Sequence, residues 1–240
     1  TRGIRGKFGK FGHWNLCAER DVEARVVQLG WCFGPPGFKC TMKERLVRPV
    51  GFEISEKAAR YHGITQDTAA RDGVQLTDVL SEFCADLFQA AREHDARLVC
   101  HHLEFDAGIL WDEMARSNMK EESRQFGLLA EKGLCTMNPE IGKWLRQAWG
   151  EDAGNADTGG RGDANLLKLK VLAHKLFKES KEEIAKHHTA GADSVLHRRV
   201  GYALYGLSRA PCRLKEESHE KRPLNNGSGV MECVLCKERF

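Results

Sequence analysis

The first strongly patterned stretch of the chain is the apolar, β-branched run 25–33, which predicts a buried strand. Residues 40–47 predict its returning partner in a hairpin, and short apolar runs at 97–100 and 134–137 predict two further strands. Apolar positions at helical spacing predict helices near 55–62, 77–88, 105–114, 141–149, 166–177 and 192–207. This order predicts an α/β domain with a mixed central sheet flanked by helices.

Local signals sharpen two parts of this pattern. Ser55 and Thr77 stand where N-caps are expected for two of the helices. The strand at 97–100 runs directly into His101 and His102, and ligands gather at such carboxyl ends of strands. Phe105 is expected to anchor the turn that follows in the core.

Composition divides the chain into a patterned domain, residues 1–209, and a polar tail, residues 210–240. With 41% hydrophobic and 30% charged residues, the 240-residue chain can bury a core, and no window is apolar enough to predict a membrane span. Residues 1–20 are rich in glycine and basic side chains and predict a loop. The net charge of +3 does not indicate a polyanion partner, but basic residues cluster at 1–20 and at 178–188, where they could hold phosphates or form solvated faces.

The nine cysteines are odd in number and scattered in spacing, which does not predict a disulfide framework. We therefore expect an intracellular protein of a reducing compartment, with most thiols behaving as small buried hydrophobes. Cys233 and Cys236 have the spacing of half a zinc site, so Zn²⁺ binding in the tail is one interpretation and a chance pair is the other.

Two acids lie beside histidines at the start of predicted helices. Asp106 follows His101 and His102, and Asp193 follows His188 by five residues. Either acid alone would be explained as a group that favours a helix N-terminus. Together they match metal-dependent phosphodiester hydrolysis, which needs carboxylates to hold divalent ions and a base, here His188, to deprotonate water.

The chain resembles the DEDD 3′–5′ exonucleases, in the DnaQ-like branch that uses histidine. The segment 101–106 resembles the second family motif, and the segment 188–193 resembles the third. His62-Gly63-Ile64-Thr65 matches a tetrapeptide common between the first and second motifs, and residues 135–137 resemble the strand after the second. The resemblance covers residues 24–207, with the motifs in the family's order.

This resemblance implies a ribonuclease-H-like fold and hydrolysis at the 3′ end of single-stranded DNA or RNA. It implies that Asp106 and Asp193 bind two Mg²⁺ or Mn²⁺ ions and that His188 is the general base. It also implies a substrate-binding role near the terminal nucleotide for His62, Ile64, Thr65 and His102, the last at a position where the family has asparagine.

The chain departs from the family at the first motif, Asp-x-Glu at the end of a strand. Asp21-Val22-Glu23 has the right letters, but no apolar strand precedes it and it abuts the predicted strand 25–33. We therefore expect the true pair upstream of Thr1 and expect the chain without it to be inactive. The alternative is an exonuclease-like module that binds nucleic acid or a protein partner without catalysis.

Overall fold

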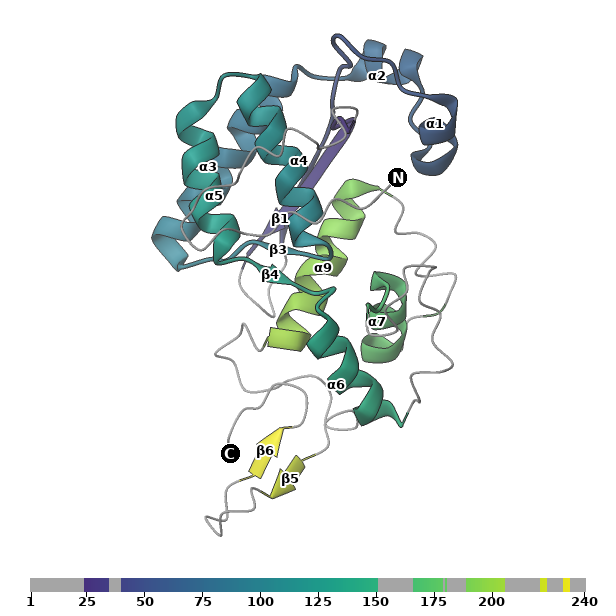
Figure 1. The fold of residues 1–240 in the computed structure, drawn as a ribbon, viewed down its shortest axis with the longest axis vertical. Helices are drawn as coiled ribbons and strands as arrows, with labels where there is room; N and C mark the ends of the chain where they lie inside the picture. Colours follow the sequence, from purple (N-terminus) through teal and green to yellow (C-terminus); the bar gives the residue numbers. More distant parts are fainter. Residues whose placement is uncertain are drawn as a thin grey trace.

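The computed structural model describes residues 24–34, 40–150, 166–178, 180, 189–205, 221–223 and 231–233. Within them the fold is mixed α/β, with more helix than strand (Figure 1). The strands are β1 (Gln28–Phe33), β2 (Thr41–Leu46), β3 (Val99–Cys100), β4 (Leu134–Cys135), β5 (Lys221–Pro223) and β6 (Met231–Cys233). The helices are α1 (Glu56–His62), α2 (Gln66–Asp72), α3 (Leu76–His94), α4 (Leu103–Arg116), α5 (Lys120–Glu131), α6 (Pro139–Trp149), α7 (Leu169–Phe177) and α9 (Ala190–Tyr205).

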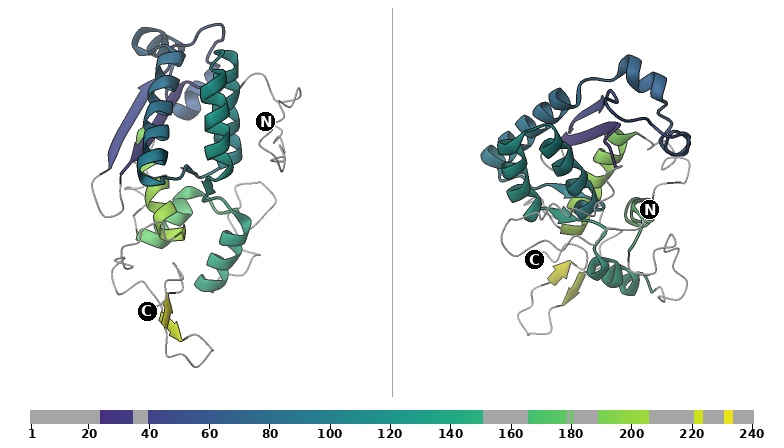
Figure 2. Two further views of the ribbon diagram at one scale, coloured as in Figure 1. Left: turned by 90° about the vertical axis from the view of Figure 1, so that its left-hand side faces the viewer. Right: turned by 45° about the horizontal axis from the view of Figure 1, so that its top comes forward.

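The described strands form three separate pairs. β1 and β2 are the predicted antiparallel hairpin, β3 and β4 pair in parallel, and β5 pairs with β6 in antiparallel fashion. The single mixed central sheet that we expected is therefore not formed among these residues. α9 packs against both β1 and β3, so a helix rather than a shared strand connects the first two pairs (Figures 1 and 2).

The structure confirms one of the two predicted helix caps and contradicts the other. The Ser55 hydroxyl accepts a hydrogen bond from the backbone N–H of Ala58 at 3.2 Å, which confirms it as the cap of α1. The prediction for Thr77 is wrong, because α3 already begins at Leu76 and Gln75 occupies the cap position. The Gln75 carbonyl accepts the first intrahelical bonds of α3, so Thr77 lies inside the helix.

The turn between β3 and α4 is also built differently from the prediction. α4 begins at Leu103, two residues earlier than expected. Leu103 is only 6% exposed and packs in the core, whereas Phe105 is 53% exposed. The anchor of this turn is therefore Leu103, and Phe105 faces solvent beside His102, whose ring centroid is 5.5 Å away.

Two apolar clusters make up the core. The larger lies between the hairpin and α3, α4 and α5, and includes the edge-to-face pair Trp31 and Phe83. The second joins α6, α7 and α9, through side chains such as Leu145, Leu172 and Leu196. α9 therefore contributes to the second core while its N-terminal part rests on the hairpin.

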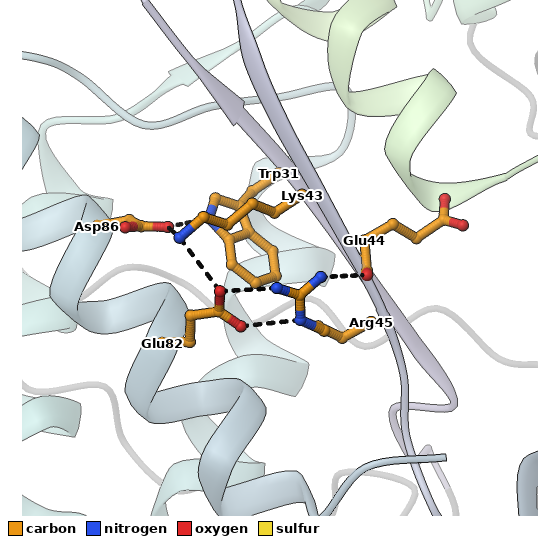
Figure 3. A network of polar contacts seen from close by, with 6 residues as sticks. All are labelled: Trp31, Lys43, Glu44, Arg45, Glu82 and Asp86. Carbon is orange, nitrogen blue, oxygen red and sulfur yellow. Dashed lines mark hydrogen bonds and ion pairs between the residues drawn. The ribbon is translucent and has the colours of Figure 1, made fainter. Parts of the chain in front are cut away.

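A polar network attaches the hairpin to α3 (Figure 3). Arg45 makes two hydrogen bonds to the Glu82 carboxylate, at 2.8 and 2.9 Å. Lys43 pairs with Asp86 at 2.7 Å, and the indole N–H of Trp31 donates to the same carboxylate at 2.8 Å. Because these groups lie partly out of water and satisfy one another, they fix the hairpin's orientation on α3.

Five cysteines within the described residues are free thiols, namely Cys32, Cys40, Cys84, Cys100 and Cys135. Burial raises the pKa of Cys32 to about 11 and that of Cys84 to about 12. Both thiols are therefore protonated at neutral pH and act as small packing groups.

Candidate functional site

Asp106 lies in the first turn of α4, directly after the His101 and His102 pair that ends β3. Burial raises the pKa of its carboxyl to about 6, and a hydrogen bond to the His102 backbone opposes that shift. An ordinary helix N-terminus would lower a carboxyl pKa, so desolvation is the dominant effect on Asp106.

Asp193 lies in the first turn of α9, where three other residues accept hydrogen bonds from backbone N–H groups. The backbone N–H of Ala190 donates to the Gln28 side chain at 3.2 Å, and that of Gly191 donates to Glu44 at 2.6 Å. The N–H of Ala192 donates to the Thr189 hydroxyl at 3.2 Å. Gln28, Glu44 and Thr189 thus accept the hydrogen bonds of the first N–H groups of α9.

A contact between two histidines joins the turn after β3 to α9. The rings of His101 and His197 lie 6.0 Å apart, centroid to centroid. His197 follows Asp193 by four residues and so shares its face of α9. Asp106 follows His101 by five residues and lies in the first turn of α4. The contact therefore links the segment before Asp106 to the helix that carries Asp193.

The histidine pair is held in an apolar setting. His101 Nδ1 lies 3.0 Å from the Thr136 hydroxyl, which is itself buried. Burial, with the neighbouring charge of His197 second, lowers the pKa of His101 to about 3. Burial lowers that of His197 to about 4. Both rings are therefore neutral at physiological pH.

α9 is fixed against the strands along its length. A Cβ on Gly30 in β1 would lie 2.1 Å from the carbonyl carbon of Ala190, so only glycine allows the helix start to sit there. Near its other end, Gly201 packs against Val99 of β3, and the Tyr205 hydroxyl donates to the Cys135 carbonyl at 2.5 Å. These contacts determine where Asp193 and His197 lie.

The predicted substrate residues between α1 and α2 have local structural roles. His62 Nδ1 accepts the backbone N–H of Ile64 at 3.1 Å, and burial lowers its pKa. Ile64 is buried, and the Thr65 hydroxyl caps α2 by accepting from Thr68 N–H at 3.2 Å. Among the described residues, neither α1 nor α2 packs extensively on α4 or α9. A role for these residues in substrate binding stays a prediction.

Several predicted residues fall outside what the structure describes. His188, Asp21, Glu23 and Cys236 lie outside the described residues, and Cys233 lies in β6, of which only the backbone is described. Within the described part of the chain, no three metal-binding side chains come together as one group. Asp106 and Asp193 are therefore the acids of the candidate site that can be placed.

Two residues of this region were not predicted from the sequence. Glu44 was assigned only to a returning strand, yet its carboxylate reaches the start of α9 from 147 positions away. His197 was read as part of an amphipathic helix, although its i+4 spacing from Asp193 was available as a signal.

Comparison with family models, with curated proteins and with solved structures finds no match to this chain. None of the described helices combines the length and the apolar character that crossing a membrane requires.

Proposed function

We propose that this chain is the core of a 3′–5′ exonuclease of the histidine-bearing DEDD type, with a ribonuclease-H-like fold. Its substrate is the 3′ end of single-stranded DNA or RNA. The observation that carries the proposal is that two acids, Asp106 and Asp193, lie in the first turns of α4 and α9. His197, one turn after Asp193 on α9, lies 6.0 Å from His101, which precedes α4, measured between ring centroids.

Asp106 supports the same function. Desolvation raises the pKa of its carboxyl to about 6, so the anion costs stability at neutral pH, and a bound positive ion would offset that cost. Carboxylate oxygens suit Mg²⁺ and Mn²⁺, so Asp106 and Asp193 have the donor chemistry for such an ion. Asp106 and Asp193 would hold such ions together with further ligands, and the bound ions would supply activation of a water and stabilisation of the leaving oxygen. A two-ion site needs more ligands than these two acids.

Residues of this chain would supply the general base and a surface for the terminal base of the substrate. By its resemblance to the family's third motif, His188 would deprotonate the attacking water. His102 and Phe105 place two rings beside Asp106, with Phe105 open to solvent, where a terminal base could stack. The half-buried His101 and His197 have pKa values lowered to about 3 and about 4, which makes them weak bases, and His188 is the stronger candidate for the general base.

The test is release of mononucleotides from a 3′-labelled single strand in Mg²⁺ by the full product of the gene. We expect Asp106→Asn, Asp193→Asn and His188→Ala each to lower the rate by about 10²-fold or more. Asp78→Asn is the matched control, because Asp78 is an exposed acid in the first turn of α3. Turnover near the wild-type rate in the Asp106 or Asp193 variant would refute the assignment.

The same experiment separates the catalytic proposal from the binding-module alternative. A non-catalytic module would retain a labelled strand in a filter-binding assay and release no nucleotide at any Mg²⁺ concentration. The codons immediately upstream of Thr1 give an independent check, since an apolar run ending in Asp-x-Glu favours the enzyme and its absence favours the module.

A further inference from the structure

A cavity of about 230 Å³ lies between the start of β1, the N-terminus of α3 and the C-terminal end of α4. Glu113, one of its lining residues, follows Asp106 by seven positions on α4, which places the cavity about 10 Å farther along the helix. It is therefore separate from the candidate nuclease site. Its volume is below the roughly 300–1,000 Å³ typical of pockets for drug-sized molecules, which favours a small ligand.

Positive charge dominates this cavity. Arg25, Arg48 and Arg116 line it, against the single carboxylate of Glu113. Arg25 pairs with Glu113 at 2.9 Å and stacks on the Phe52 ring at 4.3 Å, which leaves the ends of its guanidinium for a ligand. Arg48 is exposed, and its side chain has no ion pair within the described residues. An anion fits this excess of guanidinium groups.

The N-terminus of α3 adds to the same field. Gln75 provides no side-chain cap, and the backbone N–H groups of Leu76 and Thr77 have no acceptor in the part of the chain that the structure describes. Gln75, Leu76 and Thr77 all line the cavity. A 19-residue helix therefore presents its positive end and free N–H groups to the cavity.

Glu113 gives the second requirement on the ligand. Its side chain is fully buried, and Oε1 already accepts from Arg25 Nε and from Val26 N–H at 3.0 Å. Oε2 accepts no hydrogen bond, and its nearest cationic atom, Arg116 Nε, is 3.8 Å away. A buried carboxylate oxygen without a donor is costly, so the matching ligand brings a hydrogen-bond donor as well as negative charge.

We propose that this cavity is a binding site for a protonated phosphate, with inorganic hydrogen phosphate as its smallest ligand. The guanidinium groups and the α3 N–H groups donate hydrogen bonds to the charged oxygens. Glu113 Oε2 accepts a hydrogen bond from the P–O–H group. Sulfate has the same shape and charge but carries no proton at neutral pH. Its oxygen would therefore face Oε2 as a second acceptor, and the two oxygens would repel each other. The site therefore discriminates between the two anions.

Isothermal titration calorimetry with sodium phosphate and with sodium sulfate tests this at neutral pH. We expect phosphate to bind about tenfold or more tightly than sulfate, because a hydrogen bond to a charged group is replaced by repulsion. Arg48→Ala should weaken phosphate binding about fivefold or more, while Arg97→Ala, which removes another exposed arginine, should not. Absence of phosphate binding, equal affinities, or an unchanged Arg48→Ala variant would overturn the proposal.

Two further measurements test whether the bound phosphate must be protonated and whether Glu113 contacts it. A phosphate monoester such as methyl phosphate gains its P–O–H only below about pH 6. It should therefore bind more tightly near pH 5.5 than near pH 7.5. Equal binding at the two pH values would show that Glu113 does not contact the ligand. Glu113→Gln should reverse the preference toward sulfate. Because this buried variant risks misfolding, the anion comparison on the unaltered protein and the Arg48→Ala variant decide the question independently. The proposal does not depend on nuclease activity.

Discussion

At the scale of one residue, Asp106 carries a negative charge that its surroundings disfavour. Burial raises its pKa to about 6, from 3.8 for the ordinary carboxyl, so at neutral pH the folded chain holds an anion at a cost. Because the folded-state pKa is the higher one, the protein loses stability as pH rises through about 6. The sequence places Asp106 at a helix start, but cannot reveal this desolvation.

A prediction follows for the chelated protein. Asp106→Asn should raise the free energy of unfolding at pH 7 in EDTA by up to about 3 kcal/mol, since one pKa unit is worth about 1.4 kcal/mol. Urea unfolding followed by circular dichroism measures this. Asp78→Asn, at an exposed and favourable helix N-terminus, should instead be neutral or slightly destabilising. A destabilised Asp106→Asn protein would mean that the carboxyl is needed for folding.

The two buried histidines predict an opposite pH dependence. The pKa values of His101 and His197 are lowered to about 3 and about 4, whereas the unfolded chain titrates near 6.5. The unfolded state therefore binds more protons below pH 6.5, and stability falls with decreasing pH by up to about 1.4 kcal/mol per unit for each ring.

Unfolding free energies measured between pH 7 and pH 4.5 check this. His197→Gln should reduce the slope, and His94→Gln should leave it unchanged, because the His94 side chain is 75% exposed. If the wild type and His197→Gln have the same slope, the buried neutral pair is not present in solution.

At the scale of elements, periodicity predicted the strands of the hairpin and the strongly patterned helices. It missed α2 and α5. α2 buries only Ala69, and α5 opens with the polar run 120–125, so neither presents a wide apolar stripe. The starts of α3 and α4 shifted because tertiary contacts, rather than capping residues, decide them.

Gly30 carries a prediction about how α9 meets β1. Gly30→Ala should cost about 1–3 kcal/mol of unfolding free energy, because its Cβ would meet the backbone of Ala190 and Gly191. The displaced helix should also lose the contact between His101 and His197 and with it part of the pH slope. Gly51→Ala is the control, since Gly51 has a φ of 74° with open space around it. It should cost about 1 kcal/mol in backbone strain and leave the pH slope unchanged.

At the scale of the whole molecule, the sequence could not predict which elements far apart along the chain would contact one another. The side chains that accept hydrogen bonds from the first N–H groups of α9 come from Gln28 and Glu44, more than a hundred residues earlier in the chain. The α/β class followed from the order of the patterns, but three separate strand pairs replaced the predicted single sheet. α9 links the two cores. The sequence predicts this helix, but no local pattern shows which parts of the molecule it joins.

We propose that Asp193 of α9 and Asp106 of α4 bind one divalent cation. Backbone cleavage by Fe²⁺ and ascorbate in place of Mg²⁺ tests this proposal, because a bound iron cuts only the chain near it. We expect cuts close to both residue 106 and residue 193, all lost in Asp106→Asn and in Asp193→Asn and competed away by Mg²⁺. Cuts near one acid that persist when the other is replaced, or no site-specific cuts, would contradict it.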